Sequence, residues 1–151
     1  IRQNPSDSYQ LLFTSRLYEF LYHLCRSYSH QIPSASLTGS QRDLQRVTHV
    51  MNWVKVHYPE PLSLETAADS LALSKEYFCR LFKKYTGQTF LEYLNDVRTM
   101  HLYEDLQNSD ETITVLMEKN GLSNYKIFMR TFKKLYGSTP QKMRSNRIRH
   151  V

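Results

Sequence analysis

The sequence predicts an all-α protein built from two copies of one helical unit, joined by a long linker helix and preceded by an extra N-terminal helix. First, the segment 80–87 recurs at 130–137 with the same order of Arg, Phe, two Lys and Gly. Second, apolar residues recur at three- and four-residue steps along most of the chain, which is the period of a helix. Third, no segment shows the alternation of a half-buried strand.

The repeat extends upstream of these segments and defines the predicted unit. Leu64 pairs with Ile113, Leu73 with Leu122 and Ser74 with Ser123, all at an offset of forty-nine, so the second copy gains one residue after its serine. Because a repeat at a fixed spacing predicts copies that fold alike, both copies are expected to form the same structure. Each copy is expected to form a short helix, a tight turn and a longer basic helix ending at Gly, which is a helix-turn-helix.

Residues 1–40 are expected to form an N-terminal helix, over 9–29, and a Ser-rich linker, over 29–40. The helix carries an apolar stripe that is too wide to stay in water: Leu12, Phe13, Leu17, Phe20, Leu21, Leu24 and Tyr28. The stripe is expected to pack against a second copy in a homodimer, against an upstream domain, or back on this chain. Since the chain starts at Ile1 without an initiator Met, we interpret it as a fragment or processed chain.

Residues 41–151 are predicted to form one domain of tandem helix-turn-helix units. Pro59 and Pro61 end its first helix, and Ser63, Ser74 and Thr89 are expected N-caps. Helix ends are expected at Gly87 and Gly137, and Pro140 is expected at a first helical position. The predicted helices cover 41–58, 64–71, 75–85, 90–107, 112–119, 124–136 and 140–147. Leu44, Val47, Met51 and Val54 are expected on the buried face of the first.

The longer helix of each unit divides into an apolar face and an outward face. In the first copy the predicted core residues are Phe78, Leu81, Phe82 and Tyr85, and in the second they are Phe128, Phe132 and Leu135. The predicted outward residues are Glu76, Cys79, Arg80 and Lys83, matched by Lys126, Met129, Arg130 and Lys133. The helical period alone therefore places a basic side chain at equivalent outward positions in both copies.

These outward faces predict contact with double-stranded DNA. The chain has a net charge of +6, and residues 1–40 contribute only three basic and two acidic side chains, so the excess lies in the repeats. Arg80 and Arg130 are suited to guanine edges, whereas the pairs Lys83-Lys84 and Lys133-Lys134 are suited to phosphates. A linker helix over 90–107 spans roughly 27 Å at about 1.5 Å per residue. The two helices could then enter neighbouring major-groove segments, which lie about 34 Å apart.

Residues 62–144 resemble the DNA-binding domain of AraC/XylS-type transcription regulators. The resemblance rests on Leu64-x-x-Ala67-Ala68, on Arg80-x-Phe82-Lys83-Lys84-x-x-Gly87, and on Phe128-x-Arg130-x-Phe132-Lys133-Lys134-x-x-Gly137-x-x-Pro140. It implies two reading helices joined by a linker helix, and control of transcription, usually activation, through RNA polymerase. It also implies a small-molecule effector acting on an upstream domain. The base-contacting positions that it implies are Glu76, Cys79, Arg80, Lys126, Met129 and Arg130. Ala72 departs from the family pattern, which commonly has Gly in that turn.

Other classes of function find little support in the sequence. The six His residues lack partners at metal-ligand spacing, and no phosphate loop or Ser/His/Asp arrangement occurs, so neither a cofactor, a metal nor catalysis is expected. No apolar run is long enough for a membrane, and two cysteines suggest a reducing cytoplasm. The alternatives are a helical protein-interaction module with a basic face and the DNA-binding arm of an enzyme such as a recombinase.

Overall fold

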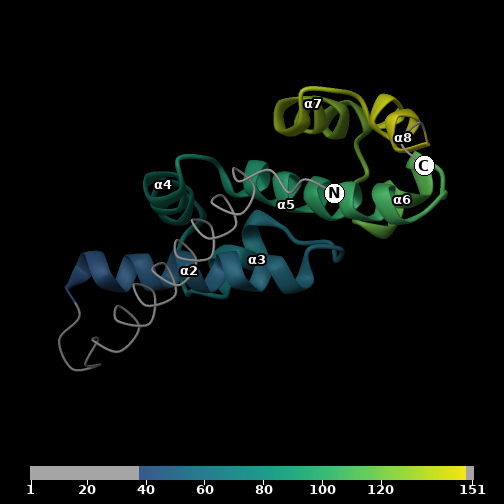
Figure 1. Cartoon of the computed structure of the whole chain (residues 1–151). Coiled ribbons are helices and arrows are strands. Elements are labelled where there is room, and N and C mark those ends of the chain that lie inside the picture. The colour runs from purple at the N-terminus through teal and green to yellow at the C-terminus, as the bar shows by residue number, and fades with distance from the viewer. Residues whose placement is uncertain (1–37, 149–151) are drawn as a thin grey trace, which may run out of the picture. The chain divides into compact units, whose positions relative to one another are not determined.

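The computed structural model describes residues 38–148, and this range contains helices and short connections without a strand. The helices are α2 (Gly39–His57), α3 (Leu64–Asp69), α4 (Lys75–Thr86), α5 (Phe90–Asn108), α6 (Ile113–Lys119), α7 (Tyr125–Tyr136) and α8 (Pro140–Ile148) (Figure 1). The all-α fold with two helix-turn-helix units and a long linker helix is therefore confirmed. The helix expected over 9–29 and nearly all of the linker 29–40 lie outside the described residues.

The predicted helix ends are confirmed by their capping contacts. Ser63, Ser74 and Thr89 each accept a hydrogen bond from a backbone amide of the first turn that they precede, which satisfies a donor the helix cannot pair itself. Gly87 and Gly137 end α4 and α7 in the left-handed conformation, with φ of 77° and 67°. Ser74 and Gly87 thus mark the start and the end of α4, and Gly137 marks the end of α7.

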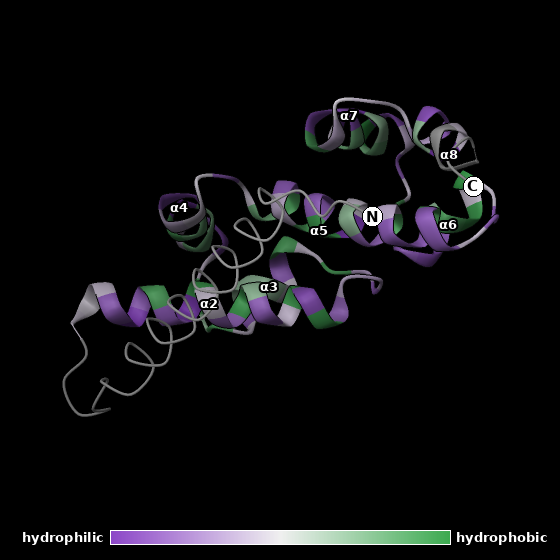
Figure 2. Cartoon of the chain, viewed as in Figure 1, coloured by the Kyte–Doolittle hydropathy of each residue, from purple (hydrophilic) through white to green (hydrophobic). Residues whose placement is uncertain are grey.

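The described residues from Gln41 onward form one compact unit that contains two hydrophobic cores. The first core is built by α2, α3, α4 and the N-terminal half of α5, and the second by the C-terminal half of α5 with α6 and α7. Figure 2 shows apolar residues on the sides of α4 and α7 that face α5, and hydrophilic residues on their outer sides. The linker helix α5 therefore contributes one half to the core of each helix-turn-helix unit.

Two expected core positions are wrong. Leu44 is 51% exposed, because the N-terminal end of α2 reaches past the packed helices, and Val50 is buried between Val47 and Val54 instead. Leu135 is 36% exposed, because the ring of Tyr136 fills the end of α7 and stacks on Tyr103 of α5 at 4.2 Å. In both cases the apolar periodicity of the helix continues past the last residue that packs in the core.

Candidate nucleic-acid interface

The outward face of α4 is exposed along its length. Phe78, Leu81 and Phe82 anchor the opposite face in the first core, and the Phe82 ring meets Phe90 edge to face at 5.8 Å. With this face fixed, the helical period turns the remaining positions to solvent. The exposed side chains are Glu76, Cys79, Arg80, Lys83 and Lys84.

The outward face of α7 is similar but not identical. Phe128, Thr131 and Phe132 are buried, and Lys126, Arg130 and Lys133 are exposed. Met129 is only partly buried and packs against the second core, so it lies at the edge of the outward face rather than at its centre. Within the described residues neither Arg80 nor Arg130 has a hydrogen bond or an ion pair, so both guanidinium groups are free to meet a ligand.

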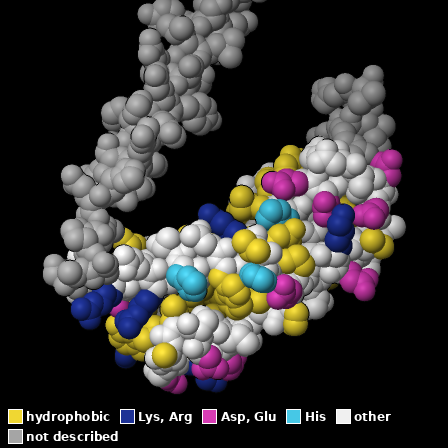
Figure 3. All heavy atoms as spheres, turned by 90° about the horizontal axis from the view of Figure 1, so that it is seen from below, with side chains coloured by type: hydrophobic (Ala, Val, Ile, Leu, Met, Phe, Trp, Pro, Cys, Tyr) yellow, Lys and Arg dark blue, Asp and Glu magenta, His cyan; other side chains and the backbone are white. Residues whose placement is uncertain are grey.

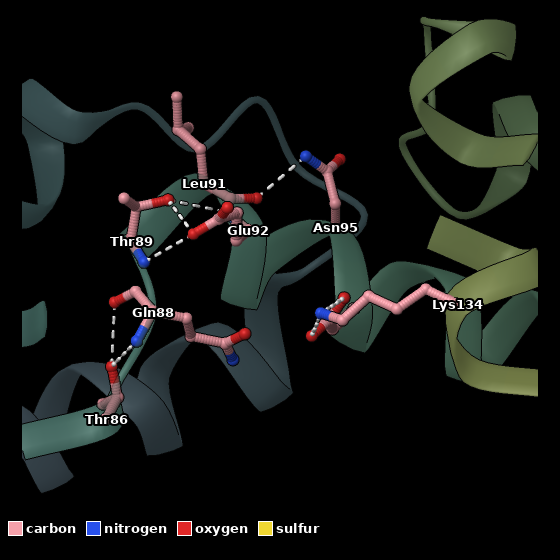
Figure 4. A network of polar contacts seen from close by, with 8 residues as sticks. Thr86, Gln88, Thr89, Leu91, Glu92, Asn95 and Lys134 are labelled. Carbon is pink, nitrogen blue, oxygen red and sulfur yellow. Dashed lines mark hydrogen bonds and ion pairs between the residues drawn. The ribbon is translucent and has the colours of Figure 1, made fainter. Parts of the chain in front are cut away.

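The two Lys pairs at the ends of α4 and α7 have different surroundings. The Lys84 ammonium lies 5.3 Å from the centre of the neighbouring Tyr85 ring. Lys134 instead reaches across to α5, where its ammonium lies 3.1 Å from a carboxylate oxygen of Asp96, and Figure 4 shows this side chain extended from α7 toward the linker helix. Asp96 is largely buried, with 15% of its side chain exposed, so this pair is less screened than one fully in water.

Basic side chains are concentrated on α4 and α7 rather than spread evenly over the described residues. α4 and α7 each carry two Lys in their last turn, where a cation also complements the helix dipole. Lys75, at the start of α4, is paired with Glu65 at 2.7 Å, and the hydrogen bond from Lys75 lowers the pKa of Glu65. Figure 3 shows that the face seen from below mixes acidic, basic, His and apolar side chains, so that face is not a continuous positive surface.

A contact between the two units centres on Arg98, which the sequence did not single out. Arg98 of α5 donates from Nε to the Tyr58 carbonyl at 2.7 Å and from Nη2 to the Glu60 carbonyl at 2.6 Å. A Cβ atom on Gly121, in the turn of the second unit, would lie 2.6 Å from the Pro59 carbonyl oxygen. Burial lowers the pKa of the Arg98 guanidinium, as expected for a cation partly withdrawn from water.

One signal in the sequence pointed toward this contact. Ala72 and Gly121 occupy equivalent turn positions, and both have a positive φ, of 52° and 72°. An exposed alanine tolerates this backbone in the first turn, so the glycine of the second turn serves a further purpose. Its close approach to the loop at Pro59 joins residues 62 positions apart, so this contact could not be predicted from the turn alone.

Two further properties of the described residues concern membranes and metals. None of the helices between residues 38 and 148 combines the length and the apolar character needed to cross a bilayer. Across the same residues, His, Cys, Asp and Glu side chains do not gather in groups of three that could hold a metal ion.

In each of the two units the second helix, α4 or α7, presents exposed basic side chains, which places the protein in the class of helix-turn-helix proteins. The family model described as a helix-turn-helix domain matches residues 67–146. The chain is 31% identical over 111 residues to the HTH-type transcriptional activator RhaS of Escherichia fergusonii, covering 74% of this chain and 40% of RhaS. The chain therefore belongs to the AraC/XylS family of transcription regulators, and these residues form its helix-turn-helix domain.

Two other similarities agree with this assignment. The chain is 33% identical over 102 residues to an uncharacterized HTH-type transcriptional regulator of Staphylococcus aureus strain MSSA476, covering 68% of this chain and 14% of that protein. The structure is similar to the DNA-binding domain of the global transcriptional factor AdpA, solved in complex with a target DNA. The TM-score is 0.60, with 25% identity over 67% of this chain and 91% of that domain. The chain thus spans less than half the length of either curated relative.

Proposed function

We propose that residues 41–151 bind a specific DNA sequence by placing α4 and α7 in adjacent major-groove segments of one duplex. The observation that carries this proposal is the equivalent exposure of Arg80 and Arg130, each on the outward face of a helix whose other face is anchored by buried phenylalanines. An exposed Arg without a competing partner is the side chain best suited to guanine O6 and N7.

The remaining contacts follow from position along each helix. Glu76, Cys79 and Arg80 of α4, and Lys126, Met129 and Arg130 of α7, occupy the N-terminal and central turns that read base edges when a helix enters the major groove. Lys83, Lys84, Lys133 and Lys134 lie one turn later and are proposed phosphate contacts. The pair between Lys134 and Asp96 makes Lys134 the weakest of the four, because binding a phosphate there competes with a carboxylate.

We further propose that the protein acts on transcription as an activator through RNA polymerase. RhaS, which is named a transcriptional activator, is the similarity that supports this role. The whole protein is proposed to respond to a small-molecule effector through an upstream domain, and to form a homodimer through residues 9–29. The sequence pattern of that segment, with its wide apolar stripe, supports the dimer.

Selection of bound duplexes from a random pool tests the central proposal. Two conserved half-sites at a fixed separation of about one helical turn, 10–10.5 base pairs, are expected from two readers on one rigid unit. Binding should weaken steeply with salt, because each phosphate contact releases counterions. Recovery of duplexes without any shared sequence would contradict specific recognition. A basic face that binds an acidic protein instead would show no preference among duplexes.

A further inference from the structure

The relative position of the two reading helices depends on few contacts besides the shared helix α5. Beside that helix, a cleft of about 820 Å³ separates the units; Pro61 and Leu62 line it from the first unit, and Met117, Leu122 and Tyr125 from the second. The two cores also meet different halves of α5, so neither core packs along the whole helix. Arg98 and Gly121 also line this cleft, so both lie where the two units face each other.

One contact between the units is the turn at residues 57–60, which α5 and the second unit approach from two sides. From α5, Arg98 donates to the carbonyls of Tyr58 and Glu60, and the His101 ring stacks on Tyr58 at 4.0 Å. From the second unit, the turn at Gly121 approaches so closely that a Cβ there would lie 2.6 Å from the Pro59 oxygen and 3.1 Å from Arg98 Nε. Arg98 therefore touches the loop of the first unit and lies against the turn that precedes α7.

Hydrogen bonds within the turn at residues 57–60 hold the carbonyl groups to which Arg98 donates. The Glu60 amide donates to the His57 carbonyl at 3.0 Å, and the Leu62 amide donates to the Glu60 carbonyl at 2.8 Å. His57 Nδ1 lies 2.9 Å from the Glu60 carboxylate. Because the Glu60 carbonyl accepts from both Leu62 and Arg98, the guanidinium is fixed on a backbone atom that is already hydrogen-bonded.

We propose that Arg98, seated against the turn at Gly121, fixes the separation of α4 and α7 and thereby sets the number of base pairs accepted between the two half-sites. Arg98 is a positioning residue and makes no contact with DNA in this role. The inference rests on the proposed function, in which both helices read one duplex. Each inserted base pair moves the second groove by about 3.4 Å and turns it by about 34°, so a rigid pair of readers tolerates few spacings.

A distance measurement in the free protein tests the mechanical part without DNA. Spin labels are placed at Cys79 on α4 and at Lys126→Cys on α7, with Cys25→Ser removing the other cysteine. A single narrow distance distribution is expected, and Arg98→Ala should broaden it. The matched control is Asn95→Ala, because the Asn95 amide donates to the Leu91 carbonyl of its own helix and, within residues 38–148, to no other element. A distribution equally narrow in Arg98→Ala and in the parent would overturn the proposal.

A binding series then tests the consequence for DNA, using the unlabelled full chain. The selected site is compared with versions whose spacer is lengthened or shortened by about one and two base pairs, and with a single half-site. Arg98→Ala is expected to reduce the preference for the best spacer by roughly tenfold, because a looser link lowers the effective concentration of the second reader. Binding to the single half-site should change less than about twofold, which a general loss of folding would not allow.

Two further variants separate positioning from stability. Arg98→Lys keeps the charge but lacks the planar fork that reaches two carbonyls. The range of spacer lengths that it accepts should therefore lie between that of the parent and that of Arg98→Ala. Gly121→Ala adds a methyl group at the same contact and should also broaden the label distance, whereas Gly137→Ala, with open space around its Cβ, should not. Unchanged spacer preference in Arg98→Ala overturns the inference alone. Equal binding of the parent to one half-site and to the full site overturns the proposed two-helix function instead.

Discussion

The two helix-turn-helix units share a sequence pattern but differ in what their turns and basic ends contact. In the first unit the turn at Ala72 is exposed to water, and Lys84 lies beside its own neighbour Tyr85. In the second unit the turn at Gly121 meets the loop at Pro59, and Lys134 pairs with Asp96 of α5. The turn and the basic end of the second unit therefore make contacts that their counterparts in the first unit do not make, so equivalent residues in a repeat need not have equivalent roles.

The linker helix explains why these contacts fall on the second unit. α5 lies between α4 and α7 in the chain, and it contributes Phe90, Leu94 and Val97 to one core and Leu102 and Leu106 to the other. Asp96 and Arg98 lie at the boundary between these two sets. The second unit thus contacts a helix whose first half is already packed in the first unit, and its surface residues must accommodate that neighbour.

The largest effects are expected from the matched substitutions Phe82→Ala and Phe132→Ala. Both rings are fully buried at equivalent positions, so each change should cost about 3–5 kcal/mol in the free energy of unfolding. Because α5 belongs to both cores, thermal unfolding followed by circular dichroism should keep one transition in each variant. A variant that unfolds in two separate steps would show that the units are independent, contrary to the comparison.

Gly121→Ala should come next and should exceed Gly137→Ala. Both positions have a positive φ, but only the Cβ at 121 meets a backbone atom, at 2.6 Å. Left-handed strain and overpacking together should cost roughly 2–4 kcal/mol at 121, against about 1 kcal/mol of strain at 137. Urea denaturation of the two variants measures the difference. Equal midpoints would mean that the turn of the second unit moves away without cost.

Arg130→Ala and Arg80→Ala compare the two proposed readers directly. Each should weaken binding to the selected site by about 1–3 kcal/mol and relax base preference at one position in its own half-site. Titration against a panel of single-base variants measures both effects. A loss that is uniform over all sequences would assign these arginines to phosphates instead.

Ala72→Gly should stabilise the first unit. The alanine has φ of 52°, a conformation that glycine adopts without the clash of a Cβ atom. After the larger entropy of glycine in the unfolded chain is subtracted, a gain of about 0.5–1 kcal/mol is expected in the free energy of unfolding. A loss of stability in urea denaturation would show that the Ala72 methyl group makes a contact that offsets the strain.

The smallest effect is expected from Lys134→Ala compared with Lys84→Ala. A lysine that binds a phosphate contributes about 0.9 to the slope of log affinity against log salt. Lys84→Ala should remove close to this amount, and Lys134→Ala less, because Asp96 competes for the ammonium. Removing the competitor with Asp96→Asn should strengthen the contribution of Lys134. Equal slopes for the two lysine variants would mean that the ion pair opens fully on DNA.

Much of the local structure was predictable because it depends on nearby residues. The caps at Ser63, Ser74 and Thr89, and the ends at Gly87 and Gly137, follow from hydrogen bonds and backbone conformations within one turn. The exposure of Arg80 and Arg130 follows from the helical period once the buried phenylalanines are placed. The proposed base contacts stay predictions.

The sequence by itself determined the helices, their repetition and the outward direction of the basic faces, since each of these depends on periodicity and on neighbours in the chain. Tertiary structure alone decided that Leu135 yields its place to Tyr136, that Lys134 pairs with Asp96, and that Arg98 and Gly121 enclose the turn at Pro59. These contacts join residues 23 to 62 positions apart, and no local rule of spacing or propensity specifies which of many distant partners a side chain meets.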